Sequence, residues 1–141
     1  MRPRAPRVLL VEDDDLTRAL LASELEGEGF VVAEAGDGED GLCQVPGFRP
    51  DVVVLDLMLP RLNGFAVARA MRALERPPGV GIVAVTGLAA EALRAEALGA
   101  GCDVVLTKPV RVALLVERVR GLLSASRPDP SIDATPRVGK A

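Results

Sequence analysis

The sequence contains no His, Trp or Tyr, and aromatic residues make up only 2% of the chain. With so few aromatic faces, sites that stack nucleic-acid bases or sugars are nearly excluded. The two cysteines, Cys43 and Cys102, have no metal-binding or redox spacing, and the lack of His also argues against a zinc site. We therefore expect two small, buried or half-buried thiols in a reducing cytoplasm.

Long apolar runs and a strong net charge are also missing. No run approaches the roughly 20 residues of a membrane span, and the run 8–11 behind the basic start is too short for a signal peptide. The 17 basic and 20 acidic residues leave a net charge of -3, which provides no field to hold DNA. These absences predict a cytoplasmic protein without direct nucleic acid binding and without a membrane partner.

The chain does contain enough apolar residues for one hydrophobic core. Hydrophobic residues make up 49% of its 141 residues, and Val, Leu and Ala must build the core. We expect a single domain over residues 7–123. It would lie between a flexible N-terminus (1–6) and a flexible tail or linker (124–141) that has Pro, Asp and Ser without periodicity.

Apolar runs alternate with helical patterns along this domain. The apolar runs cover residues 7–11, 30–35, 51–56, 81–86 and 103–106, and the helical patterns cover 15–28, 38–45, 64–74, 89–98 and 111–123. Pro46 is expected to end the second helix, and Pro77-Pro78 the third. The apolar face expected for the first helix consists of Leu16, Ala19, Leu20 and Leu25. This alternation predicts an α/β fold around a parallel sheet.

Polar residues stand at the carboxyl ends of these strands, where an open parallel sheet binds ligands. They are Glu12 and Asp13 after the first strand, Asp56 after the third, Thr86 after the fourth and Lys108 after the fifth. Crowded carboxylates need a cation, and an all-oxygen site suits Mg²⁺. At such a site Asp56 could act as the nucleophile for a phosphoryl group, whose charge the metal and Lys108 would balance.

Each of these residues has a simpler explanation when taken alone. Asp13 to Asp15 could cap the first helix, with Asp15 as the best candidate. Asp56 could be a polar strand end that faces water, Thr86 part of a turn, and Lys108 a solvated charge. The combination at the strand ends is what favours a functional site.

At these positions the sequence resembles the receiver domains of two-component response regulators. The resemblance rests on Val8–Asp15, Asp51–Pro60 with Asn63-Gly64, Val83–Gly87 and Leu106–Pro109, and it extends over about residues 7 to 123. It implies a flavodoxin-like, doubly wound sheet of five strands in the order 2-1-3-4-5, flanked by five helices. It also implies a phosphoacceptor that catalyses its own phosphotransfer, loses the group slowly and is not a turnover enzyme.

The resemblance implies a role for each site residue. Asp56 would accept the phosphoryl group, Lys108 would bind it, and the Thr86 hydroxyl would act as the switch. The ligands implied for Mg²⁺ are Asp13, Asp56, the backbone carbonyl of Met58 and, through water, Glu12. The peptide bond between Lys108 and Pro109 is often cis in this family.

The implied phosphodonor is a histidine kinase or a phosphotransfer protein. The output would pass to a protein partner, an effector domain or a second copy of the chain through the face of the fourth helix, fifth strand and fifth helix. Residues expected on that face are Ala92, Glu96, Val105, Leu114 and Arg118. Since the family commonly has an aromatic residue where this chain has Val105, a non-phosphorylated pseudo-receiver that acts as a constitutive interaction module is the alternative.

Two other functions compete with this interpretation. The stretch Gly36–Gly41 matches the dinucleotide motif G-x-G-x-x-G, but Asp37, Glu39 and Asp40 would repel a pyrophosphate and the following helix is short. A phosphatase of the haloacid-dehalogenase type needs an acid two residues after its nucleophile, where this chain has Met58. Neither function accounts for the acidic strand ends.

Overall fold

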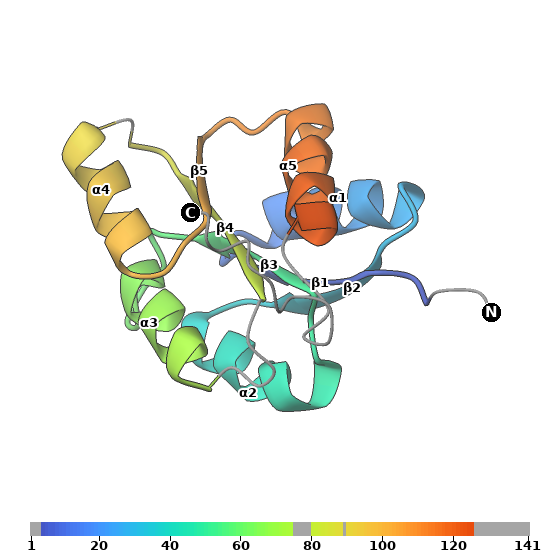
Figure 1. Ribbon diagram of the computed structural model, residues 1–141, viewed down its shortest axis with the longest axis horizontal. Coiled ribbons are helices and arrows are strands. Elements are labelled where there is room, and N and C mark those ends of the chain that lie inside the picture. Colours follow the sequence, from blue (N-terminus) through green and yellow to red (C-terminus); the bar gives the residue numbers. More distant parts are fainter. Residues whose placement is uncertain (1–3, 75–79, 89, 126–141) are drawn as a thin grey trace, which may run out of the picture.

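The computed structural model describes residues 4–74, 80–88 and 90–125, which form strands and helices in alternation (Figure 1). The strands are β1 (Arg7–Val11), β2 (Val31–Ala35), β3 (Val52–Asp56), β4 (Gly81–Thr86) and β5 (Val104–Thr107). The helices are α1 (Asp15–Gly27), α2 (Gly38–Phe48), α3 (Gly64–Leu74), α4 (Glu91–Gly99) and α5 (Val112–Ala125). All paired strands are parallel, in the order β2-β1-β3-β4-β5. The predicted fold and strand order are confirmed.

Helices cover both faces of the sheet, with α1 and α5 on one face and α2, α3 and α4 on the other (Figure 1). Successive side chains of a strand point to opposite faces, so Val8 and Val54 pack toward α1 and α5, whereas Leu9 and Val53 pack toward the other layer. Strands covered on both sides are apolar at nearly every position, and every residue of β3 and β4 is buried.

The second helix does not end at Pro46, contrary to the expectation. α2 continues to Phe48 with Pro46 in its last turn, and Arg49 follows in a left-handed conformation (φ 55°). The Arg49 N–H donates to the Val45 carbonyl at 2.9 Å and closes the helix. Because the exposed Pro46 ring is so near the helix end, it removes one backbone hydrogen bond without stopping the chain from completing its turn.

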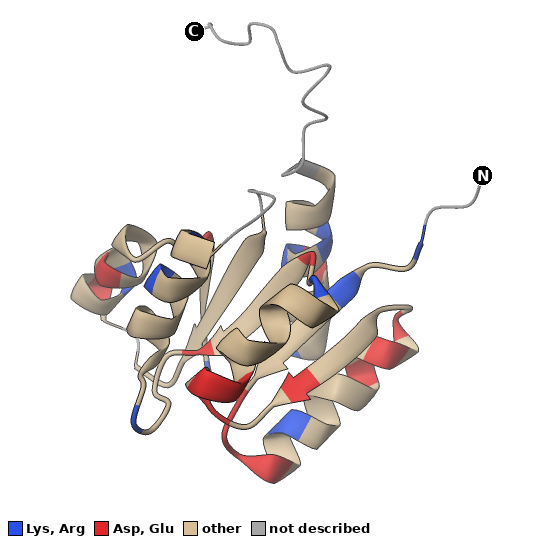
Figure 2. Cartoon of the chain, turned by 90° about the horizontal axis from the view of Figure 1, so that it is seen from below, with Lys and Arg blue, Asp and Glu red and all other residues tan. Residues whose placement is uncertain are grey.

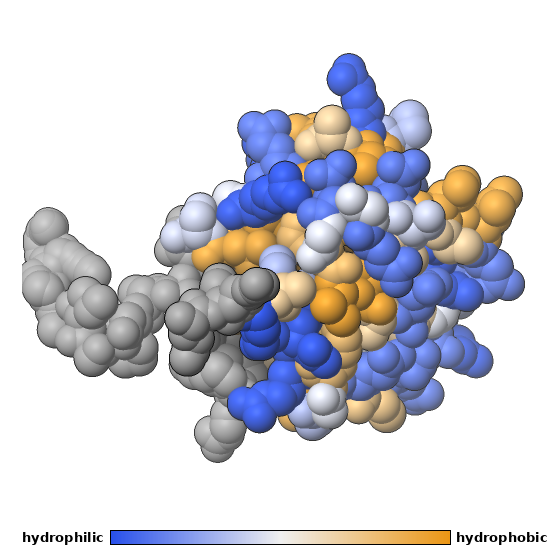
Figure 3. All heavy atoms as spheres, turned by 90° about the vertical axis from the view of Figure 1, so that its right-hand side faces the viewer, coloured by the Kyte–Doolittle hydropathy of each residue, from blue (hydrophilic) through white to orange (hydrophobic). Residues whose placement is uncertain are grey.

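The first helix turns a different face to the sheet than the sequence suggested. Of the four expected residues, Leu25 is buried, but Ala19 is exposed. Leu16 is 69% exposed and Leu20 is 57% exposed, whereas Ala22, which was not expected, is buried. The inner face consists of Arg18, Leu21, Ala22 and Leu25, at helical spacing. On the side of the molecule that faces right in Figure 1, hydrophobic residues lie between hydrophilic ones (Figure 3).

The cap of α1 also differs from the expectation. The N-cap is Asp14 and not Asp15, because the side chain of Asp14 accepts the Thr17 N–H at 2.8 Å.

The two cysteines differ in exposure. Cys102 is buried, and burial raises the pKa of its thiol to about 11. Cys43 is exposed on α2, so the prediction of a buried or half-buried thiol is wrong there.

The ends of the expected domain lie only partly within the described residues. Arg4 forms an ion pair with Asp51, and the Pro6 carbonyl accepts the Val31 N–H at 2.9 Å. Residues 1–3, most of the expected tail (126–141) and the expected helix stop at Pro77-Pro78 lie outside them. None of the helices in the described part of the chain is long and apolar enough to cross a membrane.

Candidate functional site

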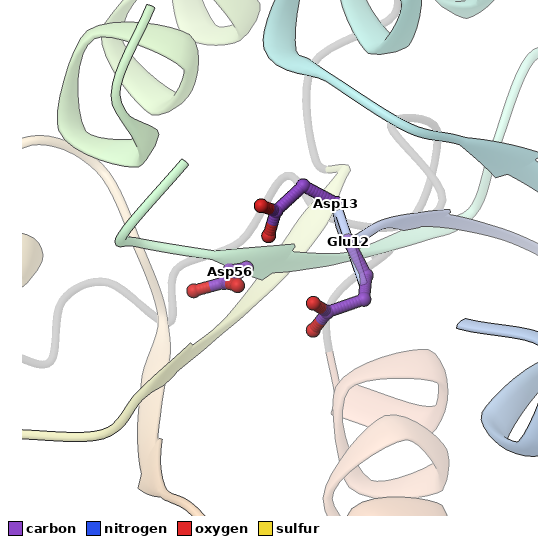
Figure 4. Close-up of side chains that lie close together, drawn as sticks. All are labelled: Glu12, Asp13 and Asp56. Atoms are coloured by element: carbon purple, nitrogen blue, oxygen red, sulfur yellow. The ribbon is translucent and has the colours of Figure 1, made fainter. Parts of the chain in front are cut away.

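Three carboxylates meet at the edge of the sheet where β1 and β3 end. Glu12 and Asp13 directly follow β1, and Asp56 is the last residue of the neighbouring strand β3. One carboxylate oxygen from each residue lies within 4.8 Å of the others, and the close-up shows the three side chains near one another at the ends of these strands (Figure 4). Acidic segments gather along this edge, where the strand arrows end (Figure 2).

Two of the three carboxylates are buried and held by backbone N–H groups. Glu12 is 3% exposed and Asp56 is 4% exposed, whereas Asp13 is exposed. The Met58 N–H donates to Asp56 Oδ1 at 2.9 Å, and the Asp14 N–H donates to Glu12 Oε2 at 3.0 Å. These bonds fix the two buried carboxylates, while the Asp13 carboxylate makes no hydrogen bond within the described part of the chain.

Lys108 joins the two buried carboxylates. Its Nζ lies 3.1 Å from Glu12 Oε1 and 3.1 Å from Asp56 Oδ2. Burial opposes the positive charge, but the hydrogen bonds and charges of Asp56 and Glu12 outweigh burial and raise the pKa of Lys108. The ammonium group therefore remains protonated at neutral pH. The Lys108-Pro109 peptide bond is cis.

The surroundings of Glu12 disfavour the charged form of its carboxylate. Burial raises its pKa, the Asp14 N–H opposes this shift, the nearby Asp56 charge adds to it, and Lys108 opposes it again. The net result is a raised pKa, which means that an uncompensated negative charge is costly at this place. A further cation would relieve that cost.

Thr86 lies at the end of β4 but is not part of the carboxylate cluster. It is 2% exposed, and its Oγ1 accepts the Leu88 N–H at 3.1 Å. Its carbonyl accepts the Lys108 N–H at 2.7 Å, which joins the ends of β4 and β5. Within the described residues the Thr86 side chain makes no hydrogen bond to Asp56, so the structure holds this hydroxyl in the β4–α4 connection.

Four of the five residues expected on the output face of α4, β5 and α5 are exposed, and one is buried. Ala92, Glu96, Leu114 and Arg118 are exposed, but Val105 is 9% exposed and belongs to the core between β5 and α4. Side chains alternate between the two faces of the sheet along β5, and the Val105 side chain points to the face covered by α2, α3 and α4. Val105 is therefore not available to a partner.

The donor set fits a hard divalent cation. Glu12, Asp13 and Asp56 together offer oxygen ligands only, and Mg²⁺ prefers one or two carboxylates completed by other oxygens and water. The exposed Asp13 is open to solvent, from which a metal would enter.

Arg18 also contacts this site, although it was not predicted from the sequence. It donates to the Glu12 carbonyl at 2.8 Å. Its helical spacing from Leu21 and Leu25 was the signal that could have revealed it.

Several characterised regulators resemble this chain. It is 40% identical over 125 residues to the DNA-binding response regulator MtrA of Mycobacterium tuberculosis, which covers 89% of this chain and 54% of MtrA. It is 36% identical over 118 residues to the DNA-binding dual master transcriptional regulator RpaA of Synechocystis, covering 84% of this chain and 49% of RpaA. The chain thus spans about half the length of these relatives.

These relatives overturn the expectation of no nucleic acid contact. Both are described as DNA-binding, and so the family of this chain includes proteins that act on DNA. The net charge of -3 describes only a chain that spans about half of such a regulator. A weak field here therefore says nothing about DNA binding by the remaining half of a relative.

Solved structures and a family model agree with these relatives. The chemotaxis protein CheY4 of Vibrio cholerae matches with a TM-score of 0.80 at 25% identity, over 84% of this chain and 99% of that one. The receiver domain of a Pseudomonas aeruginosa sensor histidine kinase, with magnesium coordinated in its active site cleft, matches with a TM-score of 0.78 at 29% identity, over 86% and 99%. The family model for the response regulator receiver domain matches residues 8–120. This chain belongs to the response regulator receiver domain family.

Proposed function

We propose that this receiver domain accepts a phosphoryl group on Asp56 with Mg²⁺ as its cofactor. The observation that carries the proposal is a buried Asp56 carboxylate that contacts Lys108 at 3.1 Å and lies beside two further carboxylates. A similar receiver domain that coordinates magnesium in its active site cleft supports the choice of metal. Asp13, Asp56 and the Met58 carbonyl would hold the ion, with Glu12 assisting through water.

The residues of this chain have separate parts in the transfer. A carboxylate oxygen of Asp56 attacks phosphorus, a P–O bond forms, and the bond from phosphorus to the donor breaks with its electrons leaving on the donor. When bound, Mg²⁺ supplies charge neutralisation for the phosphoryl oxygens. Lys108, which already lies at Asp56, offers its ammonium group to one of these oxygens. The Met58 N–H keeps the carboxylate oriented.

Thr86 supplies the proposed link to the output. Its hydroxyl oxygen now accepts the Leu88 N–H in the β4–α4 connection. A new phosphoryl group on Asp56 would attract the hydroxyl as a hydrogen-bond donor, and this movement would strain or break the bond to Leu88. The conformation of the loop before α4 would thereby depend on phosphorylation.

Mass spectrometry of the intact protein tests the phosphoacceptor. Incubation with acetyl phosphate and Mg²⁺ should add one phosphoryl group to the wild type and to Asp40→Asn, a control at an exposed acidic position on α2. Asp56→Asn should add none, because the nucleophile is gone. An unchanged phosphorylated fraction in Asp56→Asn would place the acceptor elsewhere, and an unmodified wild type would favour the pseudo-receiver.

The phosphorylated form should lose its group slowly. Water attacking an acyl phosphate needs a polar group to orient it, and the residues two positions after Asp56 and Thr86 are the apolar, half-exposed Met58 and Leu88. Time-resolved intact mass should show decay over minutes or longer, and Met58→Gln should decay faster. Loss within seconds in the wild type would contradict this assignment.

We also infer that this receiver domain controls a DNA-binding regulator. The support is its similarity to MtrA and RpaA, both described as DNA-binding and both about twice the matched length. The full-length gene product should retard DNA fragments in a gel, and treatment with acetyl phosphate should change that binding. A full-length product that binds no DNA in either state would refute the inference.

A further inference from the structure

Arg18 is a charged residue on the inner face of a helix. It stands on the stripe of α1 that continues through Leu21, Ala22 and Leu25, where a helix against a sheet ordinarily places apolar side chains. Its side chain is 19% exposed. A charged side chain in such a half-buried place requires partners for its guanidinium donors, and so its contacts show what holds it there.

Those contacts join three elements beside the carboxylate cluster. Nη1 donates to the Glu12 carbonyl at 2.8 Å, at the end of β1. Nη2 donates to Asp15 at 2.8 Å in the first turn of α1, and Nε lies 3.4 Å from Glu34 near the end of β2. The hydrogen bond to Asp15 raises the pKa of Arg18. Gly36 lies beside this guanidinium, since a Cβ built at that position would lie 3.4 Å from Nη1.

The carbonyl that Arg18 holds belongs to the peptide group between Glu12 and Asp13. The Glu12 side chain is already fixed by Lys108 and the Asp14 N–H, and the Glu12 N–H donates to Ala35. The Asp13 carboxylate has no hydrogen-bond partner among the described residues, so its direction depends on the backbone that carries it. That backbone is restrained by Arg18.

We propose that Arg18 is a positioning residue that orients the Glu12–Asp13 peptide so that Asp13 and Asp56 can bind one Mg²⁺ ion. The proposal rests on the proposed function, because it concerns the same metal. The position of Arg18 and its positive charge have opposite effects on the affinity for Mg²⁺. As a charge alone, Arg18 would repel a cation and its removal would strengthen binding, whereas as a positioning residue its removal weakens binding.

Isothermal titration with MgCl₂ at constant ionic strength distinguishes these effects, alongside the melting temperature without metal. Arg18→Met should raise the Kd for Mg²⁺ roughly tenfold, as for other residues that support a metal ligand. Arg18→Lys, which keeps the positive charge and a donor group and so disturbs the fold less, is the second variant and should raise the Kd less. The matched control is Arg120→Met, which removes a similar bond from Arg120 to the Glu28 carbonyl away from the site and should leave the Kd unchanged.

A second readout needs no metal. The Asp14 amide resonance should shift in Arg18→Met, because that amide donates to the Glu12 carboxylate that the loop carries. An unchanged or tighter Kd in both Arg18 variants, with an unshifted Asp14 amide, would overturn the role of Arg18 alone. A wild type that binds no Mg²⁺ would overturn this inference together with the proposed function, and the two failures are thereby distinguishable.

Discussion

Gly64 starts α3 directly against the backbone that carries the phosphoacceptor candidate. A Cβ at this position would lie 2.4 Å from Leu57 Cα and 2.6 Å from the Asp56 carbonyl oxygen, and both are backbone atoms that cannot turn away. The Gly64 N–H also donates to the Leu57 carbonyl at 3.1 Å. The end of β3 and the start of α3 can approach this closely only because residue 64 has no side chain.

Gly64→Ala should therefore lower the free energy of unfolding by about 1–3 kcal/mol, the cost of forcing extra volume into a packed place. It should also slow phosphorylation by acetyl phosphate, because Asp56 must shift. Urea denaturation and intact mass measure the two effects. Gly27→Ala is the control, since a Cβ there meets nothing within 4 Å, and it should not destabilise the protein. Equal stability of the two variants would show that the backbone at Gly64 yields.

At the scale of elements, α1 shows how a short loop prepares both a helix and a site. Asp14 caps the helix through the Thr17 N–H and hydroxyl, at 2.8 and 2.6 Å. The hydroxyl bond, followed by the amide bond, lowers the pKa of Asp14. The Asp14 backbone N–H meanwhile donates to Glu12, so one residue serves the helix with its side chain and the carboxylate cluster with its main chain.

The lowered pKa of Asp14 gives a signed pH dependence. The folded protein binds this proton less readily than the unfolded chain, so the stabilisation is present above the ordinary aspartate pKa of 3.8 and is lost as the pH falls through the lowered pKa. Wild type should melt higher than Asp14→Asn near pH 6, and the gap should close in acid. Thr17→Val should move the closing point back toward 3.8. A gap that stays constant with pH would show that the charge contributes nothing.

At the scale of the whole molecule, metal binding should be visible as stability. A ligand that binds only the folded state adds about 2.7 kcal/mol when present at about 100 times its Kd. Mg²⁺ should therefore raise the melting temperature of the wild type but not of Asp13→Ala, which lacks the exposed carboxylate of the cluster. Differential scanning calorimetry with MgCl₂ and with EDTA measures this. An equal rise in Asp13→Ala would place the metal at another site.

The sequence by itself determined the order of strands and helices along the chain and the polar residues that follow the strands, but not where α2 ends or which residue caps α1. A short, valine-rich apolar run such as 52–55 predicts a strand buried on both faces, and the identity of the next residue, such as Asp56, then decides what the sheet edge offers. Glu12, Asp13 and Asp56 could be predicted as a group because parallel strands end on the same edge. The strand order came from the resemblance to receiver domains.

Only the tertiary structure decided which face of each element is inside and which polar groups meet. Leu16 and Leu20 fit a helical stripe with Leu25 as well as Leu21 and Ala22 do, and the sheet selects the stripe that contains Leu21 and Ala22. The bond of Lys108 to Glu12, 96 residues away, and the hold of Arg18 on the Glu12 carbonyl depend on how α1, β1 and β5 are packed. Local patterns encode backbone conformation, whereas contacts between distant residues exist only once the sheet has brought its strands together.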